Sequence, residues 1–293
     1  MSTYICRYCR QPSDPSGIAC PLCGAKVDVH AVVSDSGWQE QPAIKDMARI
    51  QFGQSTCQVE GTMVPTADFG LAGGDWIYFS HHSLLWVEPS VQMQAMTMKG
   101  GWNRRLAGIP LVMVQAAGPG HVALSDDHPG EVIALPLAHG QSIMVREHRF
   151  LAGTSAVTYD WWPAGVWFTT GTGDDRETHY PLGRYVDRFS AQGGHGLMLI
   201  HSPGNTFIRD LGPGQSVLIQ PTSLLYWDST VQLNIHFEYP RPVTNMRTTS
   251  RYSYRTVWLR ATGPGRIAMQ SVYTRPETSQ RVTSSSGATN HSW

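Results

Sequence analysis

The strongest constraint on the fold is an internal repeat. Three segments begin with glycine and continue as alternating apolar residues, at positions 73–79, 140–145 and 214–219. Each is followed by a second strand-like run, at positions 84–87, 150–152 and 224–227. In a repeat of about sixty to eighty residues, each copy must bury its apolar residues in the same way. We therefore expect three similar units, in which the repeated residues are structural.

A second pattern supports short strands separated by turns. Three apolar runs precede a turn that contains Pro-Gly, and we interpret them as equivalent places in the three units. These runs are residues 111–114, 197–200 and 257–259, followed by turns at 118–120, 202–204 and 263–265. With 29 Gly and 19 Pro among 293 residues, the composition also favours strands and turns. The sequence predicts an all-β fold, a three-repeat sandwich or barrel.

Charge and hydropathy limit the classes of function. Lys plus Arg and Asp plus Glu both total 22, so the net charge is zero. Nucleic-acid binding usually needs a basic surface, so binding to nucleic acid is not favoured. No apolar run is long enough for a membrane-spanning helix, and the N-terminus does not resemble a signal peptide. We expect a cytoplasmic protein, with peripheral membrane association left open.

Four of the five cysteines lie near the N-terminus in two Cys-x-x-Cys turns. They are Cys6, Cys9, Cys20 and Cys23. Four thiolates at this spacing can converge on one tetrahedral ion, and Zn²⁺ is the usual one. Gly24 follows the second turn, where a residue free to adopt positive φ is useful. We predict one structural zinc per chain; with four protein ligands, the ion has no open position for catalysis.

The alternatives for these cysteines are disulfides or a redox pair. Disulfides are disfavoured in a chain without secretion signals, and a redox motif would be single. The fifth cysteine, Cys57, is expected to be a small strand residue. The expected organisation is a zinc ribbon at 1–33, a polar linker at 34–45, the three-repeat β-domain at 46–275 and a disordered polar tail at 276–293.

The repeated signature resembles a known family. The segments 84–93 and 224–233, together with the closing segment 257–271 and its Gly-Pro-Gly turn, are similar to the altered-inheritance-of-mitochondria 24 family. The likeness covers roughly residues 48–273. It implies a β-domain of three repeats, of the shortened double-stranded β-helix type, like the subunit of the tryptophan RNA-binding attenuation protein. It also implies that three chains can close into a ring, a homotrimer.

The sequence carries no recognisable catalytic constellation. His81 and His82 are adjacent, and neighbouring strand residues point to opposite faces. Other histidines, such as His121 and His201, stand alone and are expected to be solvated or hydrogen-bonded surface groups. No nucleophile elbow, phosphate loop or dinucleotide fingerprint is present. We expect a protein that is not an enzyme.

Residues 160–189 form an aromatic and charged insertion with two alternative roles. It is either a hairpin that covers the core or a surface for a protein partner, because Trp, Tyr and Arg form binding hot spots. The candidate contact residues are Trp161, Trp162, Trp167, Tyr180 and Arg184. The favoured function is a β-ring scaffold whose zinc ribbon docks an unidentified protein partner, with a role in membrane-associated organisation left open. The alternative is single-stranded nucleic-acid binding, with Arg7, Arg10, Arg104, Arg105, Arg247, Arg251 and Arg255 as candidate phosphate contacts.

Overall fold

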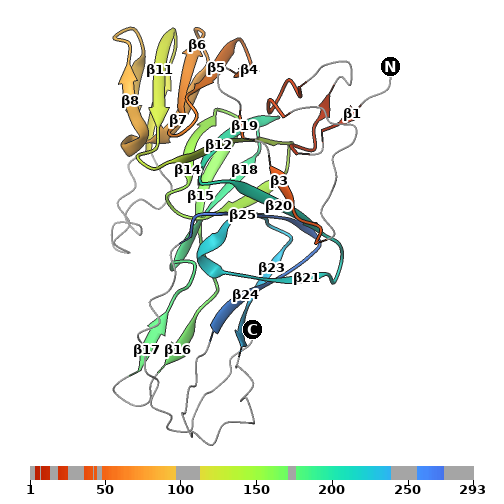
Figure 1. Cartoon of the computed structure of the whole chain (residues 1–293). Coiled ribbons are helices and arrows are strands. Elements are labelled where there is room, and N and C mark those ends of the chain that lie inside the picture. The colour runs from red at the N-terminus through yellow and green to blue at the C-terminus, as the bar shows by residue number, and fades with distance from the viewer. Residues whose placement is uncertain are drawn as a thin grey trace, which may run out of the picture.

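The computed structural model of the chain describes residues 4–6, 8–13, 19–25, 36–41, 43–44, 48–96, 113–170, 176–238 and 256–273. Nearly all regular structure in this part is β, and all strand pairs are antiparallel (Figure 1). The all-β prediction is confirmed. The predicted tail, 276–293, lies outside the described residues.

Each repeat contributes six strands, which we name positions a to f. Position a is β6 (Thr66–Leu71), β12 (Gly130–Leu137) and β20 (Thr206–Leu211); b is β7 (Trp76–Ser80), β13 (Ser142–Val145) and β21 (Ser216–Ile219); c is β8 (Leu84–Val87), β14 (Phe150–Thr154) and β22 (Leu224–Asp228). Position d is β9 (Gln92–Ala95), β15 (Val157–Pro163) and β23 (Gln232–Glu238); e is β10 (Met113–Ala117), β18 (Tyr185–Ala191) and β24 (Thr256–Thr262); f is β11 (Gly120–Ser125), β19 (Gly196–Pro203) and β25 (Gly265–Gln270). The remaining elements are β1 (Tyr4–Ile5), β2 (Pro12–Ser13), β3 (Gln39–Gln41), β4 (Ala48–Phe52), β5 (Ser55–Glu60), β16 (Phe168–Thr170), β17 (Glu177–His179) and the 3-10 helices η1 (His81–Ser83) and η3 (Pro221–Ser223).

The sheets are shared between consecutive repeats. Within each repeat, strand f pairs with a and c, and strand e pairs with b and d. Strand b of one repeat then pairs with strand c of the next, as β7 with β14 and β13 with β22. The result is a six-stranded sheet, β12-β19-β14-β7-β10-β9, and a seven-stranded sheet, β15-β18-β13-β22-β25-β20-β3. The prediction of three quasi-equivalent units is confirmed.

Two incomplete sheets end the molecule. Strands a, f and c of the first repeat form a five-stranded sheet with the β4–β5 hairpin, in the order β4-β5-β6-β11-β8. Strands b, e and d of the third repeat form the three-stranded sheet β21-β24-β23. Figure 1 shows the first group at the top and the second toward the bottom, with the two larger sheets between them.

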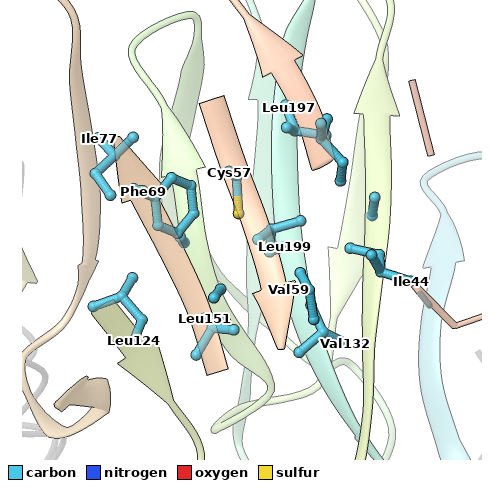
Figure 2. Close-up of a cluster of buried hydrophobic side chains, with 14 of the residues drawn as sticks. Ile44, Cys57, Val59, Phe69, Ile77, Leu124, Val132, Leu151, Leu197 and Leu199 are labelled. Atoms are coloured by element: carbon cyan, nitrogen blue, oxygen red, sulfur yellow. The ribbon is translucent and has the colours of Figure 1, made fainter. Parts of the chain in front are cut away.

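Three buried clusters lie between successive sheets. The first lies between the five- and six-stranded sheets and includes Phe69, Ile77, Leu151 and Leu199 (Figure 2). The second lies between the six- and seven-stranded sheets, and the third between the seven- and three-stranded sheets. A central strand of an inner sheet can therefore be covered on both faces, and every residue of β19 is buried. This explains why residues 197–200 form a continuous apolar run rather than an alternating one.

One equivalence inferred from the sequence is wrong. Residues 197–200 belong to β19, which is at position f. The runs at 111–114 and 257–259 instead include parts of β10 and β24, which are at position e. The strand of the second repeat that is equivalent to β10 and β24 is β18. An apolar run before Pro-Gly is produced by any buried strand that ends in a turn, so the pattern does not identify the strand's position.

The Gly-Pro-Gly turns between e and f are shaped by close backbone contacts. A Cβ at Gly118 would lie 2.4 Å from the Ala72 carbonyl oxygen, and one at Gly263 would lie 2.5 Å from that of Gly212. No side chain fits at these distances, so glycine is required where strand e leaves the b–e pair.

Part of the segment predicted as a linker joins the sheets. Residues 39–41 form β3, which pairs with β20 at the edge of the seven-stranded sheet. Gln41 is buried, and its Oε1 accepts a hydrogen bond of 2.6 Å from the Tyr226 hydroxyl. The Ile44 amide donates to the Val132 carbonyl at 3.0 Å. Residues 39–41 and Ile44 therefore contact two different sheets, which the polar composition of the predicted linker did not indicate.

Candidate functional site

The four N-terminal cysteines sit on two similar turns. In the first, the Arg10 amide donates to the Cys6 carbonyl at 2.7 Å; in the second, the Gly24 amide donates to the Cys20 carbonyl at 2.8 Å. The residue after each Cys-x-x-Cys has positive φ, 69° at Gly24 and 61° at Arg10. The prediction for Gly24 is confirmed. At Arg10 the same conformation carries a steric cost that a glycine would avoid.

The thiols of these turns converge on one point. The Sγ atoms of Cys6 and Cys23 are 3.7 Å apart, as are those of Cys9 and Cys20. All four Sγ atoms lie within 4.8 Å of one another, and all four residues are buried. A disulfide needs a separation of about 2.05 Å. A tetrahedral ion bound at about 2.3 Å would separate its sulfur ligands by about 3.8 Å, so the cluster fits a metal ion.

The protonation of the cluster also favours a cation. Hydrogen bonding to Cys20 opposes the ionisation of Cys6, but the bonds to Cys23 and Cys9 outweigh it, and the pKa of Cys6 falls to about 7. Hydrogen bonding to Cys20 raises the pKa of Cys9 and of Cys23. The cluster alone therefore readily accommodates one thiolate and resists further ionisation. A bound cation is what would let all four sulfurs lose their protons.

An ionic network attaches the cysteine module to the third repeat. The buried Arg266 donates from Nε and Nη2 to the two carboxylate oxygens of Asp210, at 2.8 Å each, and from Nη1 to the Tyr8 carbonyl. Arg10 donates to Asp210 at 2.5 Å and to Asp228 at 2.8 Å. The side chain that follows Cys9 is thus held by two carboxylates of the β-domain. This attachment offsets the backbone cost at Arg10.

The predicted partner-binding residues lie on the β15–β18 ribbon and near its tip. Trp162, Trp167 and Tyr180 are exposed, at 51%, 38% and 38%. The Arg184 guanidinium lies 5.1 Å from the Tyr180 ring centre. Trp161 is half-buried and packs edge-on against Tyr185. The ends of the supposed insertion are ordinary strands at positions d and e, and only the hairpin β16–β17 and its connections are added to the repeat.

Several candidate residues for nucleic-acid binding lie outside the described residues: Arg7, Arg104, Arg105, Arg247, Arg251 and Arg255. Arg10 is paired with two carboxylates.

One prediction about a histidine is wrong. His201 is not a surface group, because only 1% of it is exposed. It lies at the end of β19, and its Nδ1 is 3.4 Å from an Asp126 carboxylate oxygen. The repeat offered a signal for this position, because strand pairing places His201 where the other repeats have Ser125 and Gln270, directly after the apolar centre of each strand.

The ends of the molecule expose apolar strand edges. Among the described residues, β8 pairs only with β11, and β21 pairs only with β24. Trp86 on β8 is 44% exposed, whereas its equivalents Ala152 and Tyr226 are at most 2% exposed. Leu218 on β21 is 41% exposed, whereas its equivalent Met144 is 9% exposed. These residues differ because a strand of the neighbouring repeat covers only the inner copies.

The structure contains no candidate membrane span of the helical kind: within the ranges it describes, no helix has the length and hydropathy to cross a bilayer.

Comparisons with known proteins agree with this fold. The crystal structure of protein SPYM3_0169 from Streptococcus pyogenes superposes with a TM-score of 0.54, at 20% sequence identity, over 75% of this chain and 94% of that one. No curated protein sequence matches the chain. The family model described as mitochondrial biogenesis AIM24 matches residues 57–272, which leaves the four-cysteine segment outside the match. The chain therefore belongs to the AIM24 family, with a cysteine cluster added before the family's β-domain.

Proposed function

We propose that the chain is a non-enzymatic scaffold that assembles head to tail into a homotrimeric ring and carries one structural zinc per chain. The observation that supports this proposal best is the pair of exposed edges, β8 and β21. In the two inner sheets, an edge of type c always meets an edge of type b. The exposed strand β8 is at position c and the exposed strand β21 is at position b. Pairing β8 of one copy with β21 of another would therefore join the five-stranded and three-stranded sheets in the same way.

The inner junctions define the register of the proposed contact. Tyr226 pairs with Val145, Trp227 with Met144 and Asp228 with Ile143. By the repeat equivalence, Trp86 of one copy would pair with Ile219 of the next, and Val87 with Leu218. Such a contact uses different surfaces on the two copies, so it propagates until the ring closes. The resemblance to the altered-inheritance-of-mitochondria 24 family implies closure with three chains.

The zinc, in this proposal, stabilises the N-terminal module rather than taking part in chemistry. Four buried thiols leave no open coordination position, and a short segment without much core depends on its ion for folding. Because Arg10 and Arg266 join the module to repeat three, the ion also holds the module against the β-domain. The exposed aromatic ribbon with Trp162, Trp167 and Tyr180 remains the proposed surface for a protein partner.

The ring is tested by substitutions at its two edges. Light scattering of the unmodified protein should give a multiple of the 32.4 kDa chain mass, three for the proposed trimer. Trp86→Lys and Leu218→Lys should each abolish the assembly, because a charge then faces the neighbouring copy. Since each variant keeps one intact edge, their mixture should form a dimer and nothing larger.

The matched control is Met63→Lys, which alters an apolar side chain that is 74% exposed but does not lie on β8 or β21. It should leave the assembly unchanged. A wild-type protein that is a monomer at micromolar concentration would remove the ring. An assembly that survives both edge substitutions would show that other surfaces form it. For the partner surface, affinity purification with the full chain and with Trp162→Ala should differ in the proteins captured.

A further inference from the structure

A buried histidine on β19 faces an acidic turn. His201 is 1% exposed, and neither of its ring nitrogens has a hydrogen-bond partner. Its Nδ1 lies 3.4 Å from Oδ2 of Asp126. Leaving such polar atoms buried without partners costs free energy, so the position calls for an explanation.

The turn between β11 and β12 brings further ligand atoms close to Asp126. It contains Asp126, Asp127 and His128, whose ligand atoms lie within 4.8 Å of one another. Nδ1 of His128 is 3.3 Å from Oδ1 of Asp126, and Asp127 contacts the same nitrogen. The Asp126 side chain is 19% exposed and that of His128 is 66% exposed, so the turn is accessible from solvent.

The other repeats show that the fold does not require this arrangement. Strand pairing aligns Leu124, Ile200 and Met269, and therefore the following residues Ser125, His201 and Gln270. The connection after the second repeat is also shorter: β19 ends at Pro203 and β20 begins at Thr206. Histidine at this place, beside an Asp-Asp-His turn, is thus a feature of one repeat junction rather than of the shared architecture.

We propose that Asp126, His128 and His201 form a second cation site, which binds a divalent transition-metal ion with nitrogen and oxygen ligands. An ion held tetrahedrally at about 2.0–2.1 Å separates its ligand atoms by about 3.3 Å. The Asp126 carboxylate lies at about this separation from both imidazoles, 3.3 Å from Nδ1 of His128 and 3.4 Å from Nδ1 of His201. Imidazole and carboxylate together suit Zn²⁺, Ni²⁺ or Cu²⁺. The ion would use the lone pair of the buried imidazole, and Asp127 would supply additional negative charge.

The electrostatic surroundings are compatible with a cation. Burial lowers the pKa of His201, so its imidazole is neutral near pH 7, which is the form that binds metals. The Arg149 guanidinium is close enough to influence His201 and opposes a cation. The two carboxylates outweigh its single charge.

The test measures how many Zn²⁺ ions the full chain binds and with what affinity, with Zn²⁺ as the only metal added. Native mass spectrometry should find two ions per chain, and calorimetry should resolve the weaker one. Asp126→Asn, His128→Ala and His201→Gln should each weaken only the second ion, by at least the roughly 10- to 100-fold that changes outside the ligand shell cause. His128→Ala alters a mostly exposed side chain, so the variant should fold, as circular dichroism can verify. Cys6→Ser with Cys9→Ser should remove the first ion and retain the second.

The matched control is the exposed pair His121–Asp68, in which Nδ1 lies 3.0 Å from the carboxylate. His121→Ala should leave both ions bound, because among the described residues this pair belongs to no group of three or more ligand side chains. The proposal is overturned if the wild-type chain binds a single ion, if Asp126→Asn and His128→Ala keep the second with unchanged affinity, or if His121→Ala removes it as well.

Discussion

Replacing Arg266 should detach the cysteine module from the β-domain and destabilise the protein. Arg266→Met keeps the aliphatic stem but removes three donors, from which Asp210 and the Tyr8 carbonyl receive hydrogen bonds. Breaking a buried ion pair by removing one partner costs about 3–5 kcal/mol, whereas an exposed pair contributes about 1 kcal/mol or less. The Arg266 side chain is 6% exposed and that of Asp210 is 55% exposed. We therefore expect an intermediate loss of about 2–3 kcal/mol, discounted for the solvent around Asp210.

The comparison variant is Arg10→Met, which breaks ion pairs with the same Asp210 and with Asp228. The Arg10 side chain is 37% exposed, so the expected loss is about 1 kcal/mol or less. Urea denaturation of the metal-loaded proteins, followed by tryptophan fluorescence, measures both losses. Thermal unfolding should shift by about 5–10 °C for Arg266→Met in a domain of this size. If Arg266→Met is as stable as the wild type, or Arg10→Met costs as much, burial does not decide the strength of this network.

Three further predictions test the metal centre, a turn and an ionic contact. Chelation should remove the ion of the four-cysteine cluster and make the four N-terminal thiols reactive. Cys57 is buried and its pKa is raised by burial, so it should be alkylated only on global unfolding; labelling of Cys57 first, seen by mass spectrometry, would contradict this. In urea denaturation, Gly265→Ala should lower the free energy of unfolding by about 2–3 kcal/mol and Gly214→Ala by about 1 kcal/mol. Both glycines have positive φ, but only at Gly265 would a Cβ meet Thr230 Oγ1, at 2.7 Å; equal losses would refute the steric argument. Burial raises the pKa of Asp210, but the hydrogen bonds and charge of Arg266, with the charge of Arg10, outweigh it and hold the pKa below its ordinary value. This contribution to stability is therefore present above the unfolded-state pKa of about 3.9 and is lost as the pH falls through the folded-state pKa. The difference in unfolding free energy between wild type and Asp210→Asn should shrink as the pH falls below about 4, and a constant difference would be inconsistent with this reasoning.

Local patterns in the sequence are sufficient for the class of fold and for the cysteine cluster. Glycine followed by alternating apolar residues specifies a turn and a half-buried strand wherever it occurs, so its threefold appearance predicts a threefold β architecture. The two Cys-x-x-Cys turns place their thiols by local backbone geometry, with Gly24 in the expected conformation. These inferences succeed because the interactions behind them span few residues.

The tertiary structure alone decides which strands meet and which groups are buried. Strand c of the second and third repeats pairs with strand b of the previous repeat, whereas β8, strand c of the first repeat, pairs only with β11 among the described strands. Tyr226 is therefore buried while its equivalent Trp86 is exposed, although both occur in nearly the same sequence context. His201 and Asp126 are 75 positions apart in the chain, and Arg10 and Asp228 are 218 positions apart, yet each pair is in contact. No local pattern encodes such pairs. They depend on the order in which the sheets stack, and that order follows from burying one apolar face of every sheet against the next.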